Sequence, residues 1–218
     1  MRRIRTLAAF ALGATLLATA GCNIVPQRDP FPQLPPAMMA PVAPAYIQGD
    51  LIGGRAARVR KARAAGRKLL TAAQIGDYVN RQEIDLRRQT AGTGVDVLRS
   101  GELLLLRLPA TGTFDVGQSA IRPQALSTLA EIGLTLKRFD QSLVDVLGHS
   151  DSTGTPASNL TLSQKRADAV AAQLRARGVV AARIGTKGLG AAYPIADNGS
   201  DSGRTLNRRV EIKLVPLR

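Results

Sequence analysis

The stretch that decides the fold begins with Gly148-His149-Ser150-Asp151-Ser152-Thr153-Gly154 and continues as Asn159-Leu160-Thr161-Leu162-Ser163-Gln164-Lys165-Arg166-Ala167. Apolar residues at 143, 144, 146 and 147 precede it and are typical of a strand buried on both faces, and a helical pattern follows it. A carboxylate therefore lies just past the end of a strand, with an arginine in the first turns of the next helix. Such strand-to-helix turns are common ligand sites in α/β layers. An acid and a base held close together there could bind a group that carries both charges.

Several spaced blocks around this stretch resemble the OmpA-like peptidoglycan-binding family. They are Gly-His-Ser-Asp at 148–151, Asn159, Leu-Ser-x-x-Arg-Ala at 162–167, Gly-Leu-Gly at 188–190 with Pro194, and Asn-Arg-Arg-Val-Glu-Ile at 207–212. Their shared order over residues 114–214 makes the resemblance more specific than one short motif would be. The resemblance implies a domain that binds the cell wall without catalysis and without a cofactor.

The resemblance also implies which residues contact the ligand: Ser150, Asp151, Asn159, Arg166 and Arg208. Gram-negative peptidoglycan carries meso-diaminopimelate, whose free end has an ammonium and a carboxylate on one carbon. Asp151 would accept from the ammonium, and the planar fork of Arg166 would hold the carboxylate through two parallel hydrogen bonds.

Other roles for these residues remain open from the sequence alone. Asp151 and Arg166 could form an ion pair that only fixes the turn to the helix. Asn159 could cap the helix instead of contacting a ligand. Arg208 and its neighbour Arg209 could be strand-edge charges, and strand alternation lets only one of them face the site.

The sequence departs from the family pattern in the loop that begins at Phe114. The family's Phe-Asp-x-Asn block ends here in Gly117, so one side-chain hydrogen bond to the ligand is expected to be lost, or supplied by a neighbour such as Gln118. We expect this change to affect affinity and not the fold.

The amino terminus predicts export and a lipid anchor. Arginines at 2, 3 and 5 precede an apolar run at 7–17, which is typical of a signal peptide over residues 1–21 and too short for a membrane span. Thr-Ala-Gly before Cys22 resembles a lipobox, which implies acylation of that single cysteine. Because Asn23 and not aspartate follows the cysteine, the resemblance favours the outer membrane, with the domain facing the periplasm. A single cysteine also excludes an internal disulfide and a zinc cluster.

The remaining chain divides by composition. Seven prolines make residues 22–48 an extended, disordered tether, residues 49–92 form a basic helical segment, and residues 93–218 form the binding domain. The formal net charge of +14 indicates an anionic partner. Nucleic acid is not expected, because an exported protein does not meet the genome and few aromatic residues are present for base stacking.

The basic helical segment carries seven cations in fourteen residues without an acid among them: Arg55, Arg58, Arg60, Lys61, Arg63, Arg67 and Lys68. We expect Arg60, Arg63 and Arg67 to share one helix face, which either is simply solvated or binds anionic lipid. A second helix should open at a Thr71–Gln74 capping box and dock on the domain through the narrow stripe of Ile75, Val79, Gln82 and Leu86. A homodimer or an envelope protein partner bound through these helices is the alternative.

For residues 93–218 the pattern predicts an α+β fold, a two-layer sandwich of a mixed sheet and two main helices in the order β-β-α-β-α-β-β. A hairpin turns at Ser100-Gly101, and helices follow from Pro123 and over 159–177. The strand at 143–148 should run parallel to the leucine-rich strand at 103–108.

Three classes of function are compatible with these observations. The preferred one is non-catalytic binding of peptidoglycan that anchors the outer membrane to the wall. A wall hydrolase is disfavoured, because Cys22 is consumed by lipid and a single histidine cannot build a multi-histidine metal site; we give His149 no catalytic role. The third class is an envelope assembly or scaffold lipoprotein whose basic helices bind anionic lipid or a protein partner.

Overall fold

A computed structural model describes residues 51–218, so the predicted signal peptide, Cys22 and the tether at 22–48 lie outside the described residues. The helices and strands are, in chain order, α2 (Arg55–Ala64), α3 (Ala72–Thr90), β1 (Asp96–Ser100), β2 (Leu103–Pro109), α4 (Ala110–Thr113), α5 (Pro123–Arg138), β3 (Ser142–Gly148), α6 (Pro156–Ala176), the 3₁₀ helix η2 (Ala181–Arg183), β4 (Ile184–Gly188), α7 (Asp201–Asn207) and β5 (Arg209–Pro216).

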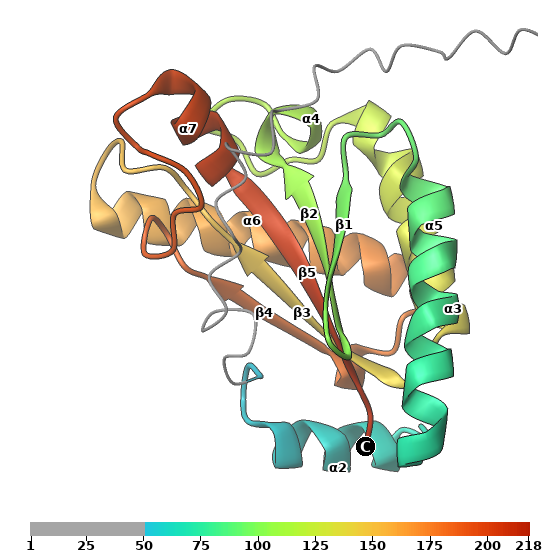
Figure 1. Ribbon diagram of the computed structural model, residues 1–218. Helices are drawn as coiled ribbons and strands as arrows, with labels where there is room; N and C mark the ends of the chain where they lie inside the picture. The colour runs from blue at the N-terminus through green and yellow to red at the C-terminus, as the bar shows by residue number, and fades with distance from the viewer. Residues whose placement is uncertain (1–50) are drawn as a thin grey trace, which may run out of the picture. The chain divides into compact units, whose positions relative to one another are not determined.

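The five strands form one mixed sheet in the order β1-β2-β5-β3-β4, with β3 and β4 parallel and the other neighbours antiparallel. Helices α5 and α6 lie against one face of this sheet (Figure 1). The predicted two-layer α+β fold is therefore confirmed. β2 and β3 run parallel, as predicted, but they are not neighbours, because β5 is inserted between them and is antiparallel to both.

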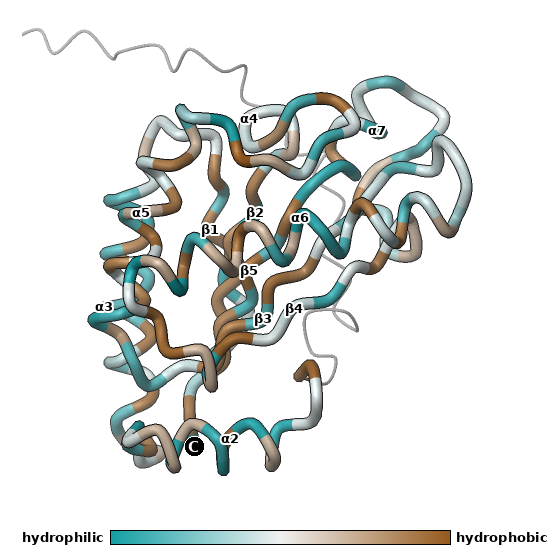
Figure 2. Tube along the Cα trace, turned by 180° about the vertical axis from the view of Figure 1, so that it is seen from behind, coloured by the Kyte–Doolittle hydropathy of each residue, from teal (hydrophilic) through white to brown (hydrophobic). Residues whose placement is uncertain are grey.

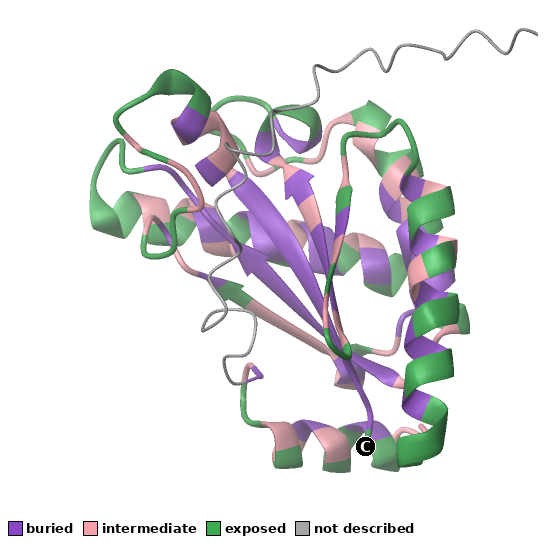
Figure 3. Ribbon diagram, in the orientation of Figure 1, coloured by how far each residue is buried: buried purple, intermediate pink, exposed green. Residues whose placement is uncertain are grey.

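The core lies between the sheet and its helices. β3 and β5 are buried along their whole length, as Figure 3 shows in purple. Alternate residues of the strands, such as Leu106, Val146 and Ile212, share one apolar cluster with Ile132 of α5 and Val170 of α6. The apolar residues of α6 in this cluster hold the helix against the strands of the sheet.

Helix α3 docks on the domain, as predicted. The main-chain nitrogen of Thr71 donates to Gln74 Oε1 at 3.0 Å, which is the reciprocal half of a capping box. Ile75, Val79 and Leu86 are buried in the same core cluster as the sheet. The apolar stripe of α3 is therefore used within the chain.

Helix α2 corrects one prediction. Gly66 has a φ of 80°, a left-handed conformation that ends a helix, so Arg67 lies beyond α2 and does not share a face with Arg60 and Arg63. Arg67 instead pairs with Asp140. None of the helices in residues 51–218 has the length and apolar content to cross a bilayer.

Candidate ligand-binding site

The site is built on the loop that leaves the carboxyl end of β3. Main-chain hydrogen bonds continue the sheet into this loop: His149 N donates to Arg209 O, and Ser150 N donates to Gly190 O, both at 2.9 Å. The main-chain amide of Ser152 then donates to Asn198 Oδ1 at 3.2 Å. The loop is therefore held at three successive points, and the side chain of Asp151 has a fixed direction.

Asp151 is 4% exposed and fully hydrogen-bonded. Its Oδ1 accepts from the main-chain amide of Thr153 at 3.0 Å and from the Thr153 hydroxyl at 2.5 Å. Its Oδ2 accepts from Arg208 Nη1 at 2.5 Å. Burial by itself would raise the pKa of this carboxyl, but the hydrogen bonds from Thr153 and Arg208 outweigh burial and hold the pKa below its usual value. Asp151 is thus an anion at neutral pH.

The direct ion partner of Asp151 is Arg208 and not Arg166. Arg208 ends α7, and its Nη2 also donates to Thr205 Oγ1 at 2.8 Å. Arg209 turns away, because its Nε pairs with Glu211 at 2.8 Å and it is 1% exposed. One of the two arginines faces the site and the other faces the interior, because Arg208 is the last residue before β5 and Arg209 is its first.

Arg166 lies on α6 and reaches the same site. Its Nε donates to the main-chain oxygen of Gln118 at 2.9 Å, and its guanidinium carbon lies 5.0 Å from the ring centroid of Phe114. Burial lowers the pKa of Arg166, the nearby charge of Arg208 lowers it further, and the charge of Asp151 opposes both. The two arginines and the aspartate therefore form one electrostatic site, although Arg166 makes no direct ion pair with Asp151.

Asn159 does not cap the helix. α6 begins three residues earlier than predicted, at Pro156, and the hydroxyl of Thr155 is the cap, accepting from Ser158 N at 3.2 Å. The amide nitrogen of Asn159 donates to the main-chain oxygens of Asp151 at 3.2 Å and Thr153 at 2.8 Å. Asn159 thus fastens the site loop to the first turn of α6.

Ser150 contributes an uncommitted hydroxyl. The residue is 7% exposed, and its Oγ makes no hydrogen bond within the described part of the chain. A buried hydroxyl without a partner is costly, so a ligand that supplied one would recover that cost.

The loop that begins at Phe114 contacts Arg166 through the main-chain oxygen of Gln118, whereas the sequence suggested a ligand contact from the Gln118 side chain. Gly117 has a φ of 70°, and the adjacent Val116 is 99% exposed at the loop tip. Gln118, which we named as a substitute for the family asparagine, contributes its carbonyl oxygen to Arg166. Phe114 forms the floor beneath Arg166, a role that the sequence motif did not reveal.

Helix α7 was not predicted; the sequence pattern indicated only a polar loop rich in Gly, Asp and Ser before the last strand. The signal for the helix was present in Ser200-Asp201, where the serine hydroxyl caps it by accepting from Gly203 N at 3.1 Å. Asn207 is fully buried and holds the loop before α7. Its side-chain oxygen accepts a hydrogen bond from Ile195 N at 2.8 Å, and its amide nitrogen donates to Asn198 Oδ1 at 2.9 Å. Since Asn198 also accepts from Ser152, Asn207 positions the site loop through one intermediate residue.

The arrangement can bind an ion of mixed charge. Two guanidinium groups and one carboxylate are fixed in direction, a hydroxyl is free, and an aromatic ring forms the floor. Within residues 51–218, no three His, Cys, Asp or Glu side chains are grouped to hold a metal ion. The chemistry offered is hydrogen bonding and charge pairing with a carboxylate and an ammonium.

A buried charge cluster lies beside the site on β5. Glu211 is fully buried and contacts Arg209 at 2.8 Å, Arg107 at 3.4 Å and His149 Nε2 at 3.4 Å. Burial opposes ionisation of Glu211, but the His149 hydrogen bond and the charge of Arg209 lower the pKa of its carboxyl well below the usual value. Burial also lowers the pKa of His149.

These two shifts predict an acid-sensitive fold. A group whose pKa is lower in the folded state stabilises the protein above its unfolded pKa and loses that contribution as the pH falls. The free energy of unfolding should therefore decline as the pH falls through 6.5, the ordinary pKa of histidine, and decline more steeply below 4.5, that of glutamate. Urea unfolding at pH 7.5, 5.5 and 4.0 measures this. The Glu211→Gln variant should show a lower stability and a flatter pH profile, and an equally steep profile would contradict the assignment.

Fold and site together define a class: an α+β binding domain with a charged ligand site at the end of its third strand. Residues 113–208 match the OmpA family. The chain is 38% identical over 225 residues to the probable lipoprotein YiaD of Escherichia coli (strain K12), and the match covers 99% of each chain. The protein therefore belongs to the OmpA family.

Two further relatives cover the domain. The outer-membrane lipoprotein YfiB of Pseudomonas aeruginosa is 42% identical over 44% of this chain and 56% of its own length. The solved structure of the cell wall anchor of the T6SS from Pseudomonas aeruginosa is 31% identical, with a TM-score of 0.55 over 60% of this chain and 96% of that chain. Membership of this family agrees with the predicted binding function, without catalysis.

Proposed function

We propose that this protein is a lipoprotein of the outer membrane whose domain binds peptidoglycan and so anchors that membrane to the cell wall. The observation that carries the proposal is the fixed group of Asp151, Arg166 and Arg208 on an OmpA-family domain. The T6SS cell wall anchor and YfiB, by their names, are a wall-binding relative and an outer-membrane lipoprotein. Both support the proposal.

The proposed ligand is the free end of meso-diaminopimelate in the stem peptide. Asp151 takes the ammonium, because within residues 51–218 its Oδ2 is bound only by the Nη1 of Arg208, a side chain that is 34% exposed and can move aside. The freed Arg208 and Arg166 then share the carboxylate, for which planar guanidinium groups are suited. Ser150 supplies a hydrogen bond, and Asn159 keeps the loop in place from its two main-chain contacts.

The amino-terminal predictions complete the proposal. Acylation of Cys22 after removal of residues 1–21 would fix the chain to the membrane, and Asn23 in the next position favours the outer membrane. YiaD, which matches the whole chain, is itself named a probable lipoprotein. In this arrangement the domain lies in the periplasm and reaches the wall through residues 22–48.

The charge of Asp151 is tested by Asp151→Asn. The variant keeps the size of the side chain and removes the charge that pairs with the ammonium, so affinity for purified sacculi should fall by about 10- to 100-fold, the value of one charge-assisted hydrogen bond. Arg166→Lys should lower affinity less, since it keeps the charge and loses the fork. Co-sedimentation with sacculi measures both, with free meso-diaminopimelate as competitor.

Asp201→Asn is the matched control, because Asp201 is an acid of the same region whose side chain is 97% exposed. It should bind sacculi as the unchanged protein does. A thermal unfolding curve for each variant separates lost binding from lost folding. Full retention of sacculi by a folded Asp151→Asn variant would refute the proposed site.

A further inference from the structure

The outward side of α2 and the turn after it carry a second charged surface, distant from the ligand site. Four exposed cations make up this basic surface: Arg60, Lys61, Arg63 and Lys68. Within residues 51–218 none of the four forms an ion pair, and α2 is predominantly hydrophilic in Figure 2. The surface therefore carries charge that the described chain does not neutralise.

The neighbouring acids are already used by other cations of the same segment. Arg58 turns inward and pairs with Asp145 at 2.6 Å, and Arg67 pairs with Asp140. No acidic residue occurs between Leu51 and Gly76. The basic surface therefore keeps its positive charge in the folded protein, because the nearby acids are paired with Arg58 and Arg67.

The basic surface is rigidly displayed. Beneath it, Ala62 is fully buried in a small apolar cluster with Leu143, Val215 and Leu217, and Val59 packs against that cluster. Arg58 adds hydrogen bonds to the main-chain oxygens of Val144 and Arg183. A helix held in this way presents its outer cations in fixed positions.

The basic surface and the ligand site lie at opposite ends of the sheet. α2 packs where β3 begins, and the site loop leaves where β3 ends, seven residues later (Figure 1). At about 3.3 Å per residue, β3 alone separates them by roughly 20 Å. The described chain also begins at the α2 end, where Ile52 N donates to Asp145 Oδ2 at 3.1 Å.

We propose that the basic surface docks on anionic phospholipid head groups of the membrane that holds the lipid anchor. The inference goes beyond wall binding but rests on the proposed anchor at Cys22. The 29 residues from Cys22 to Asp50 reach at most about 100 Å when fully extended, so the tether keeps the α2 end within that distance of the membrane and able to meet it. Docking there turns the ligand site away from the membrane and toward the wall.

The chemistry of the surface defines the kind of contact. On α2 its exposed residues are cations and alanines, and in the turn after the helix Leu69 is the one large apolar side chain exposed beside Lys68, too little to insert a helix face between lipids. Binding should therefore be electrostatic, reversible and weakened by salt. Such a contact orients the domain, and the acyl chains supply the anchoring.

The test uses the mature chain with Cys22→Ser, so that no acyl group contributes, and vesicles of phosphatidylglycerol mixed with phosphatidylcholine. Replacing Arg60, Lys61 and Arg63 together by glutamine should lower the affinity for these vesicles by about 10- to 100-fold, since each basic residue near an anionic surface contributes to attraction. Vesicles of phosphatidylcholine alone should not bind.

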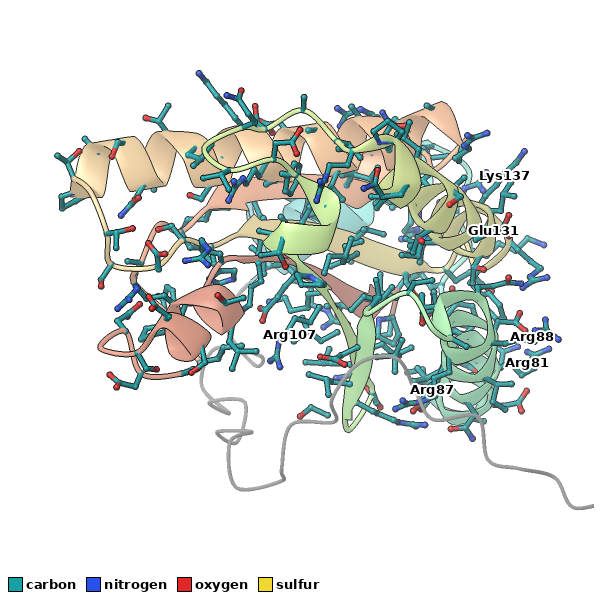
Figure 4. The ribbon with its side chains drawn as sticks, turned by 90° about the horizontal axis from the view of Figure 1, so that it is seen from above. Arg81, Arg87, Arg88, Arg107, Glu131 and Lys137 are labelled. Atoms are coloured by element: carbon teal, nitrogen blue, oxygen red, sulfur yellow. The ribbon has the colours of Figure 1, made fainter. Side chains whose placement is uncertain are left out.

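The matched control replaces Arg81, Arg87 and Arg88 together by glutamine. These are also three exposed helical cations and give the same change in charge, but they project from α3 (Figure 4). The control should bind vesicles within about twofold of the unchanged protein. An equal loss in both triple variants would overturn the proposal, because net charge and not the α2 surface would then drive binding.

Sacculi distinguish the membrane from the wall as the partner. The α2 triple variant should sediment with sacculi as the unchanged protein does, and a loss there would overturn the proposal by assigning the surface to the wall polymer. Asp151→Asn should show the opposite pattern, with vesicle binding kept and sacculus binding lost. The failure of one proposal is therefore visible independently of the other.

Discussion

Replacing Arg58 with methionine should lower the free energy of unfolding by about 3–5 kcal/mol, the cost of leaving a buried charge without its partner. Asp145 is fully buried, and its carboxylate pairs with Arg58 and also accepts a hydrogen bond from the main-chain nitrogen of Ile52. The same guanidinium also satisfies the main-chain oxygens of Ile52, Val144 and Arg183. Urea unfolding followed by circular dichroism measures the loss.

Arg67→Met is the matched control for this prediction. Arg67 also pairs with an aspartate of the domain, Asp140, but the two side chains are 27% and 36% exposed, so the loss should stay below about 1 kcal/mol. The double variant Arg58→Met with Asp145→Asn should recover part of the stability, because it removes the unpaired charge. Equal losses for Arg58→Met and Arg67→Met would show that the buried pair does not fasten α2 to the sheet.

Replacing Gly148 with alanine should lower the free energy of unfolding by about 3 kcal/mol, the upper part of the usual range for overpacking, and also weaken sacculus binding. A Cβ atom at this position would lie 2.0 Å from the main-chain oxygen of Ser163 and 2.7 Å from its carbonyl carbon. Backbone atoms in the middle of α6 cannot move aside singly, so the whole helix must shift away from β3. Arg166 moves with α6 and Asp151 stays with β3, which separates the two charges of the proposed site.

Gly76→Ala is the control, because it should raise the free energy of unfolding where Gly148→Ala lowers it. Gly76 lies within α3, and a Cβ atom there would meet nothing within 4 Å. Alanine has the higher helix propensity, so this variant should gain about 0.5–1 kcal/mol and bind sacculi normally. Thermal unfolding and sacculus co-sedimentation of both variants check the prediction. Normal sacculus binding by Gly148→Ala would show that α6 is not required to stay in place.

Local patterns predicted most of the fold. The Thr71–Gln74 capping box, the hairpin at Ser100-Gly101 and the helix from Pro123 are each encoded by adjacent residues, and each is present. The predicted start of α6 at Asn159 is three residues late, because Thr155 caps the helix and Pro156 is its first residue. Helix α7 was not predicted, because Gly203 and its short length conceal the serine cap at its start.

The structure brings the predicted charged residues together with contacts that differ from those expected, and their binding of a ligand stays a prediction. Asp151, Arg166 and Arg208 do converge, but the ion pair joins Asp151 to Arg208, which lies 57 positions away in sequence. Arg166 instead rests on Phe114 and on the carbonyl of Gln118. Spacing along a chain cannot rank these contacts, because both arginines carry the same charge and the choice depends on where α7 and α6 place them.

By itself, the sequence determined the class of the protein: its strands, helices and charged motif follow from local periodicity, capping and turn chemistry, which act over a few residues. Only the tertiary structure decided which charges pair and which remain exposed. Arg58 and Arg60 are two positions apart in one basic run, yet one is buried against Asp145 and the other faces solvent. The reason is physical: a buried charge needs a partner, and partners are brought together by folding from distant parts of the chain.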